Sequence, residues 1–248
     1  MSPLLILSVA LQIACAVHVV RTGRPMYWIF ILLVGSFIGI AVYFFAEILP
    51  NIGSSRTARR AVRGVRDRVD PEHGKRRAAR QLEVADTLDN RRRLAEQSMA
   101  SGDYQQALAL YQKSLTGLYK TDPDLMLGVA QAQFALSQPA QARATLDALI
   151  AANPNFRSSE GHLLYARAVE ATGDIDAALH EYDAVAQDFP GEEGRVRYAQ
   201  LLKRAGQRAK AAEVFNESIK RTSLAPKYYQ RDQRAWVDLA KRELQDLA

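Results

Sequence analysis

A segment that repeats at nearly constant spacing is the feature that most restricts the fold of this 248-residue chain. The stretches ASGDYQQALALYQKSL, ATGDIDAALHEYDAVAQDFP and RAGQRAKAAEVFNESI align on one template, and a degenerate copy, ALSQPAQARATLDALIAANP, lies between the first two. Their aligned turn residues, 35, 36 and 33 positions apart, are Gly102, Ser137, Gly173 and Gly206. A unit this short cannot enclose a core alone, so neighbouring units must stack on one another. The spacing therefore predicts a helical repeat structure.

Small and bulky side chains recur at fixed offsets from these turns. The two helices of a unit are predicted to cross closely at Ala107, Ala142, Ala178 and Ala211. Four positions later, on the same helix face, the side chains that fill the space against the next unit are Tyr111, Leu146, Tyr182 and Phe215. The close-packing positions of the first helices are Ala130, Ala166 and Ala199. Pro154 and Pro190 are expected to end second helices.

This pattern resembles the tetratricopeptide repeat (TPR), whose period is about 34 residues, over roughly residues 88–225. The resemblance implies four helix pairs and a concave groove, lined by the first helix of each pair, that binds a peptide or helix of a partner. Residues 226–246 predict one more amphipathic helix, with Trp236, Leu239 and Leu244 buried, that covers the last repeat. We therefore expect an all-α solenoid with a capping helix over residues 81–248.

The N-terminal part of the chain is apolar. Residues 3–20 and 26–46 carry no charged side chain, and each is close to the 20 or so residues that cross a bilayer as a helix. With the turn RTGRP between them, residues 1–50 predict a two-helix transmembrane hairpin. Gly35 and Gly39 have the GxxxG spacing that lets two helices pack closely, within one chain or between two.

The stretch RPMYWIFILLVGSFIGIAVYFF resembles the N-terminal membrane hairpin of the cardiolipin synthase and phospholipase D group. That family's catalytic signature, H-x-K-x4-D, is absent. In the sole H-x-K, His73-Gly74-Lys75, the aspartate position holds Arg80. The resemblance therefore extends to the membrane segment and not to the chemistry.

Positive charge gathers after the second apolar run, because ten of the twelve Lys and Arg residues of residues 1–80 lie between Arg56 and Arg80. Residues 51–80 predict a basic amphipathic connector, interrupted by Asp70-Pro71 and Gly74. Arginines flank its apolar stripe, and this pattern predicts either binding to anionic lipid headgroups or a solvated cluster that only sets topology. The candidate lipid ligands are Arg56, Arg59, Arg60, Arg63 and Arg66.

The same asymmetry places the C-terminal part in the cytoplasm by the positive-inside rule. The whole chain resembles uncharacterised bacterial inner-membrane TPR proteins and, loosely, the haem-biosynthesis-associated membrane proteins with two spans and TPRs. These resemblances imply a multi-pass protein of the bacterial inner membrane with its repeat module in the cytoplasm.

The repeat alignment also predicts the side chains that face the groove. These are Arg92, Glu96, Gln131, Phe134, Arg167, Glu170, Arg197, Gln200, Lys203 and Arg204. Glu96 and Gly128 replace the two asparagines of the chaperone-binding TPR clamp, so that specificity does not carry over. Residues 81–191 have a net charge of −7 and residues 192–248 of +5, so the C-terminal end of the groove is expected to favour acidic segments.

No catalytic, metal-binding or cofactor motif occurs in the sequence: HExxH, a Walker loop, GxGxxG and GxSxG are all absent. The excess of basic residues lies in the connector and not on the repeats, which argues against a nucleic-acid partner. We therefore expect a membrane-anchored scaffold without enzymatic activity or cofactor, which binds a protein partner of acidic character. The alternative is a non-catalytic regulator of phospholipid or envelope metabolism that responds to anionic lipid. Oligomeric state stays open.

Overall fold

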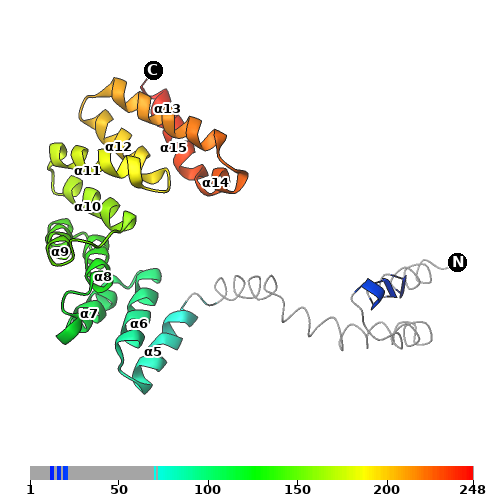
Figure 1. Cartoon of the computed structure of the whole chain (residues 1–248), viewed down its shortest axis with the longest axis vertical. Coiled ribbons are helices and arrows are strands. Elements are labelled where there is room, and N and C mark those ends of the chain that lie inside the picture. The colour runs from blue at the N-terminus through cyan, green and yellow to red at the C-terminus, as the bar shows by residue number, and fades with distance from the viewer. Residues whose placement is uncertain (1–11, 14–15, 18, 22–69, 71, 248) are drawn as a thin grey trace. The chain divides into compact units, whose positions relative to one another are not determined.

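The structure is a computed structural model, and it describes residues 12–13, 16–17, 19–21, 70 and 72–247. The chain divides into a unit of residues 1–73 and a compact unit of residues 74–248, called here the repeat module. The repeat module is all-α in its described residues (Figure 1). Its first helix, α5, spans His73–Val84, so the predicted interruption at Gly74 is wrong: this glycine lies in the first turn of the helix.

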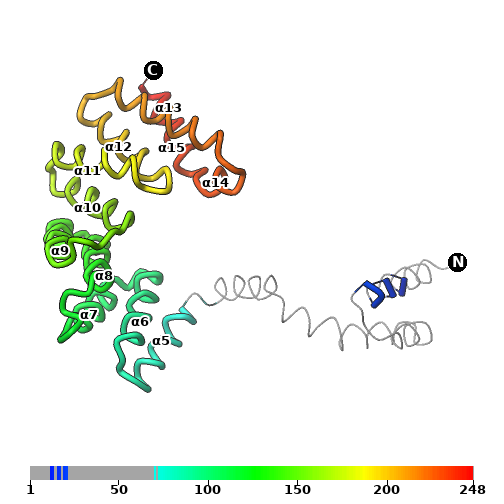
Figure 2. The backbone as a smooth tube through the Cα atoms, in the orientation of Figure 1, coloured from blue at the N-terminus to red at the C-terminus, as the bar shows by residue number. Residues whose placement is uncertain are grey.

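Four antiparallel helix pairs follow α5 in sequence order, and from α7 to α13 each helix packs against the one before it (Figures 1 and 2). The pairs are α6 Leu88–Ala100 with α7 Tyr104–Ser114, α8 Pro123–Ala135 with α9 Pro139–Ala152, α10 Ser159–Ala171 with α11 Ile175–Asp188, and α12 Glu193–Arg204 with α13 Arg208–Leu224. A short 3-10 helix, Gly117–Tyr119, lies between the first two pairs. The predicted helical solenoid is therefore confirmed for this part of the chain.

The turns within the pairs explain why one small residue repeats. Gly102, Gly173 and Gly206 have φ angles of 80°, 89° and 81°, a region in which glycine has no steric penalty. Ser137, in the degenerate copy, adopts the same conformation with φ of 60°. After each of Gly102, Ser137 and Gly206, the next amide donates to a carbonyl five residues back, which is the Schellman pattern that ends a helix. The local sequence therefore sets where each first helix stops.

The core confirms the packing positions predicted from the repeat. All seven predicted alanines are fully buried, and Tyr182 and Phe215 are too. The largest apolar cluster joins α10, α11, α12 and α13 to the C-terminal helix, and it includes Tyr182, Val196, Leu201 and Phe215. Alanine at the crossings lets the helix axes approach, and the ring four residues later fills the gap to the next pair. Stability of the module therefore rests mostly on contacts between adjacent helices.

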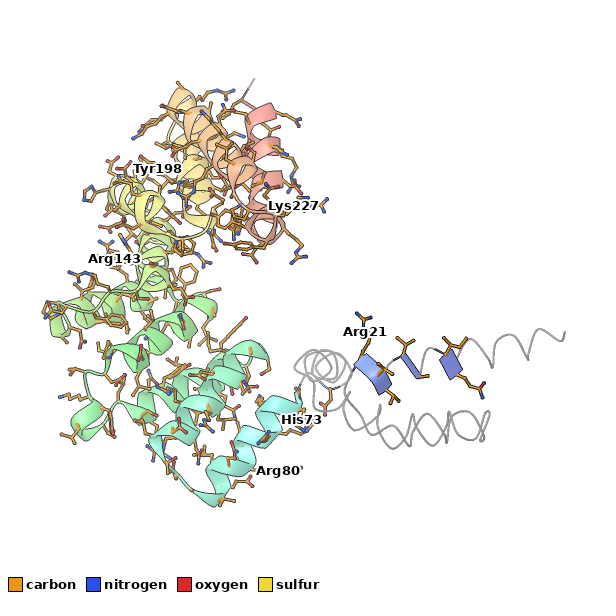
Figure 3. The ribbon with its side chains drawn as sticks, turned by 45° about the vertical axis from the view of Figure 1, so that its right-hand side comes forward. Arg21, His73, Arg80, Arg143, Tyr198 and Lys227 are labelled. Carbon is orange, nitrogen blue, oxygen red and sulfur yellow. The ribbon has the colours of Figure 1, made fainter. Side chains whose placement is uncertain are left out.

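The C-terminal cap differs from the single helix that the sequence predicts. It forms two helices, α14 Lys227–Asp232 and α15 Arg234–Gln245, which break at Gln233. At the break, Oε1 of the Gln233 side chain accepts a hydrogen bond from the amide of Glu192, 2.9 Å away at the start of α12, which connects the cap to the last pair. Trp236, Leu239 and Leu244 were predicted to be buried; they pack against the core but are only partly buried, and the buried residues of α15 are Val237 and Ala240. Figure 3 labels Lys227, at the beginning of α14.

Within the described residues, no helix is both long and apolar enough to cross a membrane. The longest, α13, has 17 residues and carries six charged side chains, whereas a span takes about 20 mostly apolar residues. This finding contradicts the predicted location as a multi-pass protein of the bacterial inner membrane with its repeats in the cytoplasm, and we do not retain it. Of the two predicted spans, residues 26–46 lie outside the described residues, as do most of residues 3–20.

Candidate functional site

The first helices of the four pairs, α6, α8, α10 and α12, carry the ten predicted groove residues, and we call the surface they form the helix-A face. Three of these helices start with a side-chain cap: Thr87 on α6, Asp122 on α8 and Ser158 on α10 each accept a hydrogen bond from an amide three residues on. Such caps satisfy amides that the helix itself leaves unpaired. The caps therefore fix where each helix begins and which side chains it presents on this face.

Two of the predicted residues meet at the centre of the helix-A face. The guanidinium carbon of Arg167, on α10, lies 4.7 Å from the ring centroid of Phe134, on α8. This is a cation–π arrangement between consecutive pairs. Both side chains are partly buried, so the ring and the planar guanidinium form one surface. The sequence identified both residues but did not indicate that they stack.

Glu170, one turn after Arg167 on α10, is held from two sides. It accepts a hydrogen bond of 2.6 Å from the hydroxyl of the buried Tyr182, and it forms an ion pair with Arg204 of α12. Burial, and then the hydrogen bond to Glu170, raise the pKa of Tyr182 above its usual range, so the hydroxyl remains a donor. The carboxylate of Glu170 is therefore already bound by Tyr182 and Arg204 of the same chain.

Arg167 is different, because it forms no ion pair with any described residue. Burial lowers the pKa of its guanidinium, and the positive charge of Arg197 lowers it further. The carboxylates of Glu193 and Glu170 act in the opposite direction but are engaged by Arg197 and Arg204. A partly desolvated cation without a carboxylate partner is costly in free energy. An anion of a partner is therefore expected to gain more binding free energy at Arg167 than at the other predicted groove residues of this face.

The C-terminal end of the helix-A face is less positive than the sequence suggests. The ammonium of Lys203 lies 2.8 Å from Glu243 and 3.5 Å from Asp246. The amide of Gln200 also donates to Glu243, at 2.8 Å. Both acids come from the end of the cap, about forty residues along the chain, where α15 packs against α12 and α13. The predicted cationic end of the groove is thus neutralised by the cap.

Arg197 is also satisfied within the module. Its Nε atom lies 2.8 Å from Glu193, one turn earlier on α12, and its guanidinium carbon lies 5.2 Å from the ring centroid of Trp236. At the other end of the face, Arg92 lies 3.7 Å from Glu96 in an exposed i,i+4 pair of α6. Gln131 lies partly exposed on α8. The structure therefore joins Phe134 with Arg167, Glu170 with Arg204, and Gln200 with Lys203, and it leaves the Arg92–Glu96 pair separate.

We expect the link between α12 and the cap to weaken in acid. Hydrogen bonds from Lys203, and then from Gln200, hold the pKa of Glu243 below its ordinary value of 4.5. A carboxyl whose pKa is lower in the folded state contributes stability that is present above the unfolded pKa and is lost as the pH falls through the folded pKa. Lys203→Gln should therefore lower the melting temperature near neutral pH, and its difference from wild type should shrink below about pH 4.5.

Thermal unfolding of both proteins across this pH range, followed by circular dichroism, measures the effect. Lys227→Gln, an exposed change on α14, is the control and should follow wild type throughout. A difference between Lys203→Gln and wild type that does not vary with pH would show that the ion pair with Glu243 is not its cause.

A hollow that the sequence did not predict lies between the second and third pairs. It has a volume of about 590 Å³ and is lined by one end of α9, the α9–α10 loop, the start of α10 and part of α11. None of the ten predicted groove residues lines it. One signal in the sequence could have indicated it: Leu146 stands where the other copies have Tyr or Phe, and Leu146 is part of its wall. We call this hollow the α9–α11 pocket.

The predicted lipid-headgroup site stays untested. The predicted lipid-binding arginines, Arg56, Arg59, Arg60, Arg63 and Arg66, lie outside the described residues. Among the residues that the structure does describe, no group of three or more His, Cys, Asp or Glu side chains is arranged to hold a metal ion.

Residues 98–168 match the family model described as "Tetratricopeptide repeat". A thermophilic TPR protein of Thermus thermophilus has a similar structure, with a TM-score of 0.52 and 20% identity over 66% of this chain and 86% of that one. A solved structure of the putative kinesin light chain TPR-like repeats of Podosopora anserina has a TM-score of 0.51 and 18% identity, over 64% and 90% of the two chains. A comparison with curated proteins gives no match.

At these identities the two solved structures show the fold alone. The family match does not reach the N-terminal segment, so the resemblance of that segment to the cardiolipin synthase group stays a prediction. For the repeats, the spacing of the copies, the geometry of their turns, the family match and the similar structures agree. The repeat module has a TPR-like, all-α solenoid fold, and residues 98–168 within it match the tetratricopeptide-repeat model.

Proposed function

We propose that this protein is a scaffold that binds an acidic segment of a protein partner on the helix-A face, with Arg167 and Phe134 as the central anchor. The observation that carries the proposal is the Arg167 guanidinium, which stacks at 4.7 Å on Phe134 and lacks a carboxylate partner among the described residues. A stacked guanidinium is held in one orientation and can bind a carboxylate with two parallel hydrogen bonds. A TPR solenoid is a fold that binds protein partners, which fits this use.

The charges around Arg167 indicate where on the helix-A face an acidic side chain of the partner would bind. Lys203, Arg204 and Arg197 already have carboxylate partners in the module. An acidic side chain of the partner therefore gains less from them than from Arg167. Phe134 offers apolar area next to the cation. The preferred segment accordingly carries an Asp or Glu beside an apolar side chain, and it need not be acidic along its whole length.

The partner can be found with a photo-crosslinking amino acid at Gln131, one turn before Phe134 on α8, in the full chain expressed in its own cells. We expect crosslinked segments that contain Asp or Glu next to apolar residues. Arg167→Gln should reduce the yield of these products about tenfold or more, because one charge-assisted hydrogen bond contributes about 1.5–3 kcal/mol and about 1.4 kcal/mol is a factor of ten. Arg231→Gln removes an exposed arginine of α14 and serves as the matched control.

Two results would contradict the proposal. One is a crosslinking yield that Arg167→Gln lowers no more than Arg231→Gln does. The other is a set of crosslinked segments without acidic residues. Circular dichroism of both variants should show wild-type helicity, because Arg167 is partly exposed and supports no buried ion pair.

A further inference from the structure

The α9–α11 pocket has a physical origin in the second repeat. In the other three copies a ring is buried at this position: Tyr111 and Tyr182 precede a following pair, and Phe215 precedes the C-terminal cap. The second copy has Leu146 at this position, and a leucine leaves space that a ring would fill. Leu146 and Leu149 form apolar wall from α9, and Leu127 of α8 adds to it. The resulting volume, about 590 Å³, is in the range of about 300–1,000 Å³ that is usual for ligand sites.

The entrance of the pocket has apolar surface that the module leaves exposed. Ile150, on the last turns of α9, is 53% exposed although it lines the pocket. Phe156, in the α9–α10 loop, is partly exposed beside it. An occupant with apolar side chains would remove both from water, at a gain of about 25 cal/mol per Å² buried.

The charged groups at the pocket are mostly acidic. Three carboxylates line it: Asp147 of α9, and Glu181 and Asp188 of α11. Asp147 accepts a hydrogen bond of 2.8 Å from the hydroxyl of Tyr165, and Glu181 lies 3.1 Å from Nε2 of His162. Arg157 is the cation on the wall, and its Nη1 donates to the carbonyls of Pro154 and Phe156. The negative charge therefore exceeds the positive charge at this site.

Two helix carboxyl ends and one helix amino end, that of α10, line the pocket, so helix polarity adds a small net negative potential. α9 ends at Ala152 and α11 ends at Asp188, and residues at both carboxyl ends line the pocket. A helix carboxyl end carries roughly half a negative charge, which favours a cation. Neither α9 nor α11 has a basic residue in its last turn, and Asp188 is an acid at this end. Asp188 also has no ion pair or hydrogen bond among the side-chain contacts of the described residues. The carboxylates and helix ends at this site therefore favour a positive charge, and the module itself does not supply one.

We propose that the α9–α11 pocket binds a basic, apolar segment of a protein partner, with bulky apolar side chains against Leu146, Leu149 and Phe156 and a lysine or arginine at Asp147, Glu181 and Asp188. The volume holds several side chains, which favours a peptide segment over a lone amine. The site differs from the helix-A face in residues and in the sign of its charge. It therefore gives the scaffold a second binding surface, independent of Arg167.

The test uses the fluorescein-labelled peptide LKKLLKKLL and the full chain, with binding followed by fluorescence anisotropy. We expect wild type to bind this peptide and not its acidic counterpart LEELLEELL. The triple variant Asp147→Asn, Glu181→Gln, Asp188→Asn should bind about tenfold more weakly, because it removes three ion pairs with the peptide at exposed or partly exposed carboxylates. The matched control is Glu83→Gln, Asp176→Asn, Glu217→Gln, which removes three exposed acids elsewhere and should bind like wild type.

Leu146→Phe tests the pocket without changing any charge. It restores a ring at the repeat position and should fill the space, so peptide binding should be lost while helicity is kept. If this variant does not fold, Ile150→Ser at the exposed entrance provides the apolar test, and it should weaken binding several-fold. Arg167→Gln should leave this binding unchanged, so failure here and failure of the proposed use of the helix-A face are distinguishable.

Three outcomes would overturn the proposal. The first is equal loss of binding in the two triple variants, which would mean that total charge and not the pocket attracts the peptide. The second is unchanged binding in both Leu146→Phe and Ile150→Ser. The third is displacement of the peptide by spermidine at equal concentration, which would show that the carboxylates recognise an amine without the apolar contacts.

Discussion

Phe215→Ala is expected to lower the free energy of unfolding by about 3–5 kcal/mol, the largest effect among the substitutions considered. The ring is fully buried in the cluster that joins α10, α11, α12, α13 and α15. Its loss removes apolar burial and leaves a cavity that the surrounding helices fill only in part. Because each pair of a repeat protein is stabilised by its neighbours, we expect α12–α15 to unfold before the first pairs.

Urea denaturation followed by far-ultraviolet circular dichroism measures this loss. Leu224→Ala also removes a large apolar side chain, but Leu224 is 79% exposed and its replacement should cost about 0.5 kcal/mol or less. Two transitions in the variant, with about a third of the helicity of the module lost in the first, would agree with early unfolding of the last pair and the cap. Equal losses in the two variants would contradict the burial that the structure assigns to Phe215.

Glu192→Ala is the second change with a large expected effect, because this carboxylate has no exposed surface. It accepts hydrogen bonds of 2.8 Å from the hydroxyls of Ser218 on α13 and Tyr229 on α14, and Nε of Arg221 lies 3.2 Å away. Arg195, also buried, approaches it at 4.0 Å. One carboxylate therefore connects the start of α12 to α13 and to the cap.

Removing this carboxylate leaves the hydroxyls of Ser218 and Tyr229 without their acceptor and the buried guanidinium of Arg195 without its countercharge. Breaking a buried charge pair from one side typically costs about 3–5 kcal/mol, and Arg195 would be the group left without its partner. Glu193→Ala is the matched control, because Glu193 is the next residue and its partner Arg197 is partly exposed. That change should cost about 1 kcal/mol or less. Urea denaturation of the two variants gives the comparison, and similar losses would argue against a special role of Glu192.

The two proposed binding surfaces differ in the sign of the charge that the module leaves unpaired at each of them. On the helix-A face the module pairs Arg197, Lys203 and Arg204 with its own acids, and Arg167 is left over among the described residues. At the α9–α11 pocket the acids exceed the cations, and the helix ends add to their field. A scaffold with an anion site and a cation site can hold two segments of different charge at once.

Much of the fold could be predicted from the sequence because its determinants are local. The turn residues Gly102, Ser137, Gly173 and Gly206 act through their own φ angles, which need no distant contact. The buried alanines and rings recur at fixed offsets within each copy, and a helix converts a fixed offset into a fixed face. The sequence also has two apolar runs near its N-terminus, which predicted two membrane spans. Within the described residues, however, no helix is long and apolar enough to cross a membrane.

Details of the candidate sites depend on residues far apart in the chain, and only the tertiary structure decided them. Lys203 pairs with Glu243, forty residues later. At the break between α14 and α15, the side chain of Gln233 accepts a hydrogen bond from the amide of Glu192, 41 residues earlier. The regional charge of +5 over residues 192–248 concealed these pairings, because a sum of charges does not record which charges meet. The α9–α11 pocket is tertiary for the same reason: Leu146 leaves space only because α10 and α11 pack where they do. The repeated sequence determined the solenoid, and contacts between its helices decided which charges remain for a partner.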